Sequence, residues 1–391
     1  MSTTEKILDS NSDVVSTKTL LHEAIPVTGT ILSGTYSDNN IKNYSHGMFQ
    51  SVFDYPYLSS SANHIFDITM GYSADSVLSN SANTQNQKKI NIYNQMAQVL
   101  YGHDENGTIR KFDLDGNLID TTTDKIKEAY FVSFSRLLVK DEIQKGTFNL
   151  TLNAGSNHGH GTSGGGAGDS INGSAASGSL HRILITDASG SDSFKINSPV
   201  GEYGILFATA SSGGALTGGE LLVSGKNTSA CGLIFYQAGV AVLTASLFAS
   251  GSKFAGTPVQ GFIGLNNNRN LDMTKANLNI NNAFTASAIS GNCDNLRHRI
   301  ETVSFNNTVE LNSTIFFCRI NHNEFNYSSN PTYLNSSKIR VKDSQADPPV
   351  SYITSIGLYD DDDRLLAVGK LSEPLRKDPT IEYTLRARLD Y

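Results

Sequence analysis

The chain has 391 residues, of which 17% are charged, and its formal net charge at pH 7 is −7. This weakly acidic balance argues against a basic surface of the kind that binds nucleic acid, so we expect no nucleic-acid partner. The length is sufficient for two or three domains with sizeable cores. Glycine is frequent, with 34 residues, and tryptophan is absent, a composition typical of a β-rich protein with many turns.

The chain contains three widely spaced cysteines, Cys231, Cys293 and Cys318. An odd number at such spacing predicts neither a disulfide framework nor a metal site, so we expect them to be small core residues. Residues 1–16 carry no basic stretch followed by an apolar one, which is the pattern of a secretory signal. We therefore expect a protein that is made in the cytoplasm and not secreted.

Residues 1–26 are too polar to form a core of their own, which indicates an arm that becomes ordered only against a partner surface. Residues 27–70 show the alternation of β-strands, with several aromatic side chains. No long helical period interrupts this stretch, so we expect the N-terminal part of the chain to be β-rich.

The best helical pattern of the chain covers residues 85–101. Apolar side chains recur there at three- and four-residue spacing, at Ile90, Tyr93, Met96, Ala97 and Leu100. Thr84 and Gly102 stand where the helix would be capped. The opposite face, which includes Lys89, is polar, so we expect an amphipathic helix.

Two apolar stretches give a less direct strand signal. Residues 129–138 fit either a helix or a buried strand, and the run at residues 131–134 favours the strand. Residues 303–319 predict two strands, with a break at Asn306-Asn307 or at Asn312.

Residues 153–180 consist mostly of glycine, serine, alanine and asparagine. Such a segment has too few large apolar side chains to offset the entropy of ordering, which indicates a surface loop or linker. His158 and His160 lie within it, but two histidines supply only part of a zinc site. The glycines match no phosphate-binding or dinucleotide-binding pattern, so we expect no metal and no cofactor.

Strand patterns resume over residues 181–290. The stretch at residues 232–249 is apolar enough to suggest a membrane helix, but Gln237 and Gly239 interrupt it. They divide it into two runs of strand length, which favours a buried hairpin, so we expect no membrane span.

Residues 350–359 and 364–371 carry apolar side chains on both faces, which is typical of central strands that are covered on both sides. The four aspartates at residues 360–363 lie between them and predict an exposed hairpin turn. A calcium site is the sharper alternative, but adjacent carboxylates cannot all face one ion and no EF-hand spacing is present.

The final strand pattern covers residues 381–391, where apolar and polar side chains alternate. Leu385, Ala387 and Leu389 share the face that we expect in the core. Arg386 and Arg388 share the other face, which we expect to meet water or an acidic partner surface. Such a strand must be paired along its length, because an unpaired edge would be prone to aggregation.

A loop rich in amides and hydroxyls precedes these strands and is punctuated by aromatic side chains. We expect contacts with partner proteins at Phe325, Tyr327, Tyr333, Arg386 and Arg388. No catalytic residue and no metal ligand is proposed.

Four segments resemble virion structural proteins of large contractile-tailed, T4-like bacteriophages, including those of cyanobacteria. They are residues 131–138 (FVSFSRLL), 141–148 (DEIQKGTF), 232–244 (GLIFYQAGVAVLT) and 323–331 (NEFNYSSNP). The final alternating strand adds to this resemblance. The resemblance implies a non-enzymatic tail or baseplate component that is made in the host cytoplasm and resides in the virion. Its partners would be other virion proteins and copies of itself, which it meets through strand edges and the arm.

Two other classes of function stay open. A receptor-binding tail fibre, which would contact the host surface, or a capsid decoration protein would also be β-rich, polar and poor in cysteine. A fibre should show a long repeat, and none is visible. A glycan-degrading tailspike would need two carboxylates across a cleft and aromatic platforms, above all tryptophan, so we expect no enzyme.

The expected fold is mostly β with a minor helical component (α+β), made of several domains of antiparallel β-sheets or sandwiches. The expected segments are an arm (1–26), a β-rich domain with one helix (27–152), a Gly/Ser-rich loop or linker (153–180), a middle β domain (181–290) and a C-terminal β domain (291–391).

Overall fold

The structure is a computed structural model. It describes residues 5–26, 40–80, 82–117, 125–153, 182–210, 229–248, 253–254, 257–258, 284–285, 288–326, 334–335, 338–339 and 349–391. Strands predominate over helices and the sheets are antiparallel, which confirms the mostly β, α+β class. Within these residues, no helix is long and apolar enough to cross a membrane.

The chain forms two compact units. The larger unit is His22–Val309, and the smaller unit combines Met1–Leu21 with Glu310–Tyr391. Strands β1 (Val14–Pro26) and β15 (Ile300–Ile320) contribute residues to both units. The five segments expected from the sequence stay a prediction.

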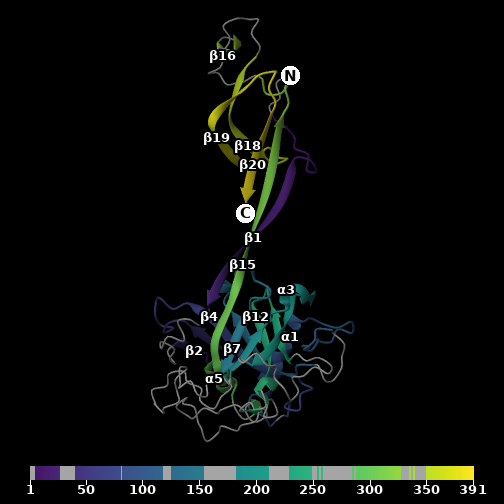
Figure 1. Cartoon of the computed structure of the whole chain (residues 1–391), viewed down its shortest axis with the longest axis vertical. Helices are drawn as coiled ribbons and strands as arrows, with labels where there is room; N and C mark the ends of the chain where they lie inside the picture. Colours follow the sequence, from purple (N-terminus) through teal and green to yellow (C-terminus); the bar gives the residue numbers. More distant parts are fainter. Residues whose placement is uncertain are drawn as a thin grey trace. The chain divides into compact units, whose positions relative to one another are not determined.

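The larger unit is built on a sheet whose strands run in the order β15-β7-β8-β10-β11-β12-β5-β4-β3-β2. Figure 1 labels β2, β4, β7, β12 and β15 of this sheet. β6 pairs with β15, and β9 pairs with β10. The bounds of these strands are β2 (Ile41–Asn43), β3 (Gln50–Phe53), β4 (His64–Tyr72), β5 (Glu128–Phe134), β6 (Glu142–Ile143), β7 (Asn149–Asn153), β8 (Arg182–Thr186), β9 (Lys195–Ser198), β10 (Gly201–Ala210), β11 (Ser229–Phe235) and β12 (Val240–Thr244). A separate pair is formed by β13 (Lys253–Phe254) and β14 (Thr257–Pro258).

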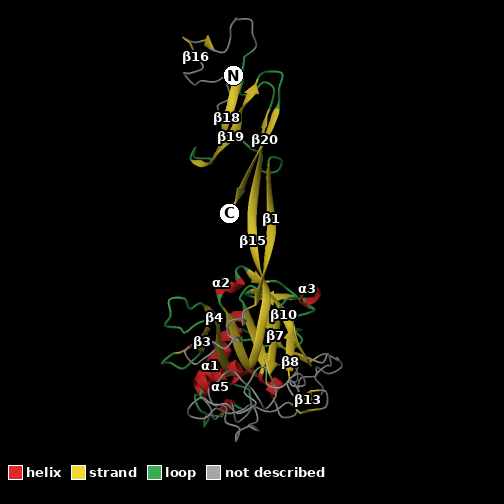
Figure 2. Cartoon of the chain, turned by 60° about the vertical axis from the view of Figure 1, so that its left-hand side comes forward, coloured by secondary structure: helices red, strands yellow, loops and turns green. Residues whose placement is uncertain are grey.

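Helices α1 (Asn86–Leu100) and α5 (Ile289–Arg299) pack against β4 (Figure 2). Gly71 of β4 allows the close approach of α1, because a Cβ there would run into the carbonyl oxygen of Lys89 and lie 2.9 Å from the backbone nitrogen of Tyr93. The short helices are α2 (Arg136–Val139), α3 (Gly190–Ser193) and the 3-10 turn η4 (Ala245–Phe248).

The centre of the sheet is buried on both faces. All residues of β12 are buried, and β11 is its antiparallel neighbour. The expected hairpin in place of a membrane helix at residues 232–249 is therefore confirmed. The strand expected at residues 129–138 is confirmed as β5, which is followed by the short helix α2.

Four details differ from the sequence expectations. β15 continues unbroken through both expected break points, Asn306-Asn307 and Asn312, because Asn307 pairs with Ile143 of β6 and its buried side chain donates to the carbonyl of Leu138 (2.9 Å). Gln85, and not Thr84, is the N-cap of α1. Lys89 is buried although it belongs to the expected polar face. Helix α5 was not expected at all.

In the smaller unit, β15 pairs with β1 and with β20 (Tyr383–Asp390). β18 (Ser351–Tyr359) and β19 (Leu365–Lys377) form a separate two-stranded hairpin, as expected from the aspartate turn between them (Figure 2). β16 (Leu334–Asn335) and β17 (Lys338–Ile339) form another short pair.

Candidate functional site

Strand β20 carries the alternation expected from the sequence. All eight of its residues pair with β15, from Tyr383 opposite Ile320 to Asp390 opposite Ser313. Its arginines are exposed, so the expected pairing and facing are confirmed. The expected core position of the apolar face is wrong, because Leu385, Ala387 and Leu389 are only half-buried.

Among the described residues, the β18–β19 hairpin exposes several large apolar side chains. Leu365 is 53% exposed, Leu366 is 67% exposed and Val368 is 62% exposed. The expectation of central strands covered on both faces is therefore wrong for the isolated chain. A two-stranded hairpin is at best marginally stable alone in water, because it has no enclosed face. The apolar side chains of this hairpin are thus available to a partner.

The smaller unit has almost no core of its own. Among its described apolar residues, Ile315 and Ile320 are the only buried ones. The extended cluster of buried apolar residues lies in the larger unit and ends at Phe305. Strand pairing and polar contacts therefore carry most of the order within the smaller unit.

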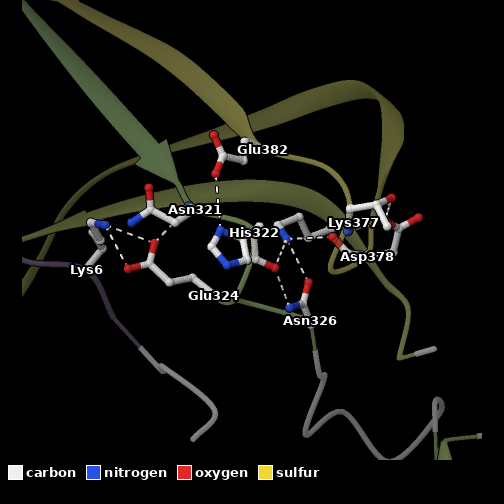
Figure 3. Close-up of polar contacts among 9 residues, drawn as sticks. Lys6, Asn321, His322, Glu324, Asn326, Lys377, Asp378 and Glu382 are labelled. Atoms are coloured by element: carbon white, nitrogen blue, oxygen red, sulfur yellow. Dashed lines mark hydrogen bonds and ion pairs between the residues drawn. The ribbon is translucent and has the colours of Figure 1, made fainter.

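A buried lysine organises the polar contacts of the smaller unit (Figure 3). The ammonium of Lys377, at the end of β19, donates to the carbonyl oxygens of His322 (3.0 Å) and Asp378 (2.9 Å) and to Oδ1 of Asn326 (2.7 Å). Three donors meet three acceptors, so the buried charge is satisfied. Burial lowers the pKa of Lys377. This contact fixes the loop that follows β15 to the end of β19.

The N-terminal arm lies along β15 and is held by polar contacts. Its ion pairs join Lys6 to Glu324 (2.9 Å), Asp13 to Arg319 (3.3 Å) and Lys18 to Glu310 (2.6 Å). The hydrogen bonds from Lys6 hold the pKa of the Glu324 carboxyl below its usual value. The side chains of Val15, Leu20 and Leu21 remain exposed, so the arm adds uncovered apolar surface to that of the hairpin.

The residues chosen from the sequence do not form one cluster. Phe325 has a left-handed backbone (φ 54°) and its carbonyl accepts a hydrogen bond from Ser351. Arg388 contacts Asp390 on its own strand (2.6 Å). In the described part of the chain, no ion pair or ring contact joins Phe325 to either Arg388 or Arg386. Tyr327 and Tyr333 lie outside the described residues, as do His158 and His160.

Sequence reasoning missed the two features that distinguish the smaller unit. A lone lysine such as Lys377 carries no signal of burial, because its acceptors come from segments remote in the sequence. The apolar residues on both faces of β18 and β19 predict that both faces are buried. The pattern does not show whether the surface that buries them belongs to the same chain.

A Ser, Asp and His group on β3 and β4 has the wrong order for nucleophilic catalysis. Ser51 donates to Oδ1 of Asp67 (2.5 Å), and Nε2 of His64 lies 2.9 Å from the same oxygen. The carboxylate stands between serine and imidazole, whereas catalysis needs the imidazole next to the serine to take its proton. This group is therefore a structural polar network.

Asp187 is a buried carboxylate whose pKa is raised by burial, as an acid catalyst would require. It accepts hydrogen bonds from the backbone N–H groups of Gly146 (2.8 Å) and Phe148 (2.9 Å). These contacts fix the turn before β7 and give Asp187 a structural role. No group of three histidine, cysteine or acidic side chains suited to a metal ion occurs among the described residues.

No protein-family model, curated protein or solved structure matches the chain. Its function must therefore be inferred from its own residues. The feature with the clearest physical consequence is the uncovered apolar surface of the smaller unit.

Proposed function

We propose that the chain is a non-enzymatic structural protein of a bacteriophage virion, a tail or baseplate subunit that assembles with copies of itself and with other virion proteins. The observation that carries the proposal is the β18–β19 hairpin, whose apolar side chains are more than half exposed at Leu365, Leu366 and Val368. The resemblance of residues 131–138 and 232–244 to virion structural proteins of contractile-tailed phages is the reason for placing the chain in a virion.

The exposed hairpin favours assembly for an energetic reason. Complete burial of a large aliphatic side chain contributes about 1.5–3 kcal/mol. Leu366 is 67% exposed, so about 1–2 kcal/mol of its burial is still to be gained at an interface. Several such side chains in each copy can offset the cost of association, which is several kcal/mol.

The arm supports the same proposal. Fixing the backbone of one residue costs about 1–2 kcal/mol, whereas an exposed ion pair contributes about 0–1 kcal/mol. The ion pairs of Lys6, Asp13 and Lys18 therefore do not offset the ordering of residues 5–21 by themselves. The pairing of β1 with β15 contributes to this ordering, and a partner that covers Leu20 and Leu21 would add further stabilisation.

The alternatives share part of this support. A receptor-binding fibre or a capsid decoration protein would also assemble through exposed strands. The larger unit has an extended apolar core, whereas the smaller unit has almost none. This difference favours a tail or baseplate subunit whose smaller unit is covered by neighbouring subunits.

Antibody labelling of purified phage particles tests the proposed location. Antibodies raised against the chain should label the tail or baseplate in electron micrographs. Label on the capsid would favour a decoration protein, and label at distal fibre tips would favour a receptor-binding protein. Absence of the chain from purified particles by mass spectrometry would contradict the proposal.

A further inference from the structure

One face of the β15–β20 pair carries a group of exposed arginines, which we call the arginine face. Cross-strand neighbours share a face, and Arg386 pairs with Phe317 while Arg388 pairs with Ile315. Arg319, two residues after Phe317, lies on the same face. All three arginines are exposed, and they flank apolar side chains.

The arginines are unequally paired within the chain. Arg319 contacts Asp13, and Arg388 contacts Asp390 and Ser313. Arg386 has no hydrogen bond or ion pair with any described residue. This face therefore offers at least one free guanidinium beside partly buried apolar side chains.

The tip of the β18–β19 hairpin carries the opposite charge. Asp360 turns its side chain back to the backbone N–H groups of Asp362 (3.1 Å) and Arg364 (2.7 Å). Asp361 and Asp363 are exposed, and their carboxylates have no partner among the described residues. The ion pair that the tip does make, Arg364 with Asp362 (2.9 Å), is local.

We propose that the tip of the β18–β19 hairpin of one copy docks on the arginine face of a second copy. This inference rests on the proposed self-assembly and names the surfaces that meet. The free carboxylates of Asp361 and Asp363 complement the free guanidinium of Arg386, and guanidinium binds carboxylates in a matched two-point geometry. The neighbouring Leu365 and Leu366, both more than half exposed, would be covered at the same time.

A second copy suits the arginine face better than a nucleic acid does. The net charge of the chain is −7, which repels a polyanion at long range. Each copy carries both complementary surfaces, so copies can join head to tail into a ring or a filament, as heterologous contacts do.

Charge reversal tests the inference in the full-length chain. The variants Arg386→Glu and Asp361→Lys each change one exposed side chain without a described partner, so neither should alter the melting temperature. Each single variant should weaken self-association at least about tenfold at low salt, as measured by sedimentation velocity. The double variant should recover most of the wild-type affinity, because the charges are then reversed on both surfaces. Lys370→Glu with Glu373→Lys, at exposed positions of β19, is the matched control.

The outcomes separate this inference from the proposed function. If wild type associates and the single variants associate equally well, the docking of the tip on the arginine face is wrong while self-assembly stands. Loss of association in the single variants without recovery in the double variant also overturns the pairing. If wild type stays monomeric at every concentration, the proposed self-assembly fails and the docking fails with it. Binding of a duplex DNA oligonucleotide that Arg386→Glu abolishes would assign the face to a polyanion instead.

Discussion

Replacing Leu366 by serine should weaken self-association and leave the folded chain intact. Leu366 is 67% exposed, so in the single chain the substitution removes little buried surface and should change the free energy of unfolding by less than about 0.5 kcal/mol. At an interface the same side chain would contribute about 1–2 kcal/mol. Since about 1.4 kcal/mol corresponds to a factor of ten, the dissociation constant should rise about 5- to 30-fold.

Leu137→Ser is the matched control for this prediction. Leu137 is also a leucine, is 79% exposed and belongs to the larger unit. Sedimentation equilibrium over a range of concentrations gives the dissociation constants of wild type and both variants. Equal weakening by Leu366→Ser and Leu137→Ser would show a non-specific effect of surface hydrophobicity. An unchanged dissociation constant in Leu366→Ser would show that the exposed hairpin does not take part in assembly.

Three further predictions concern stability. Gly71→Ala should destabilise the larger unit by about 3 kcal/mol in chemical denaturation, because its Cβ would strike the backbone of α1, whereas Gly369→Ala, with nothing within 4 Å, should be neutral. Lys377→Met should destabilise the smaller unit by about 2–4 kcal/mol, because three oxygens lose a charged donor. Unchanged protection of the backbone amides of that unit from hydrogen exchange would contradict the role of this lysine. Burial lowers the pKa of Lys89 from 10.5 to about 8, so between about pH 8 and 10 the unfolded chain binds more protons at this lysine than the folded chain does. The free energy of unfolding of wild type relative to Lys89→Met should therefore increase with pH over this range. A difference that does not change with pH would show that the pKa of Lys89 is not lowered.

Local periodicity was enough to predict several elements. The alternation through Leu385 and Leu389 predicts a paired strand, and β20 pairs with β15 along its whole length. Helical spacing predicts α1 at residues 85–101 to within a residue or two. The two apolar runs around Gln237 predict the β11–β12 hairpin. In each case the signal lies in neighbouring residues, which is where sequence patterns act.

The remaining features depend on residues that are distant in the sequence. The contact of Asp13 with Arg319 joins segments about three hundred positions apart, and no local pattern encodes that pairing. In the sequence, Lys89 and Lys377 have the appearance of surface lysines. Their burial follows from backbone carbonyl groups, remote in the sequence, that accept their hydrogen bonds. Helix α5 had a signal that was missed, since Ile289, Cys293 and Leu296 are buried at helical spacing.

The exposed strands of the smaller unit show most clearly what a sequence pattern cannot predict. Apolar side chains on both faces of β18 and β19 predict strands that are covered on both sides, whereas Leu365, Leu366 and Val368 are more than half exposed in the chain. The covering surface is absent from the described part of the same chain. A pattern in one chain cannot distinguish cover by its own residues from cover by another copy.

The mass of the purified chain in solution shows whether copies of the chain assemble with one another. A single copy has a mass of 42.1 kDa, and sedimentation equilibrium at micromolar concentration measures how many copies associate. We expect a mass above that of one copy, which decreases on dilution or with Leu366→Ser. A folded species of 42.1 kDa at all concentrations would contradict self-assembly.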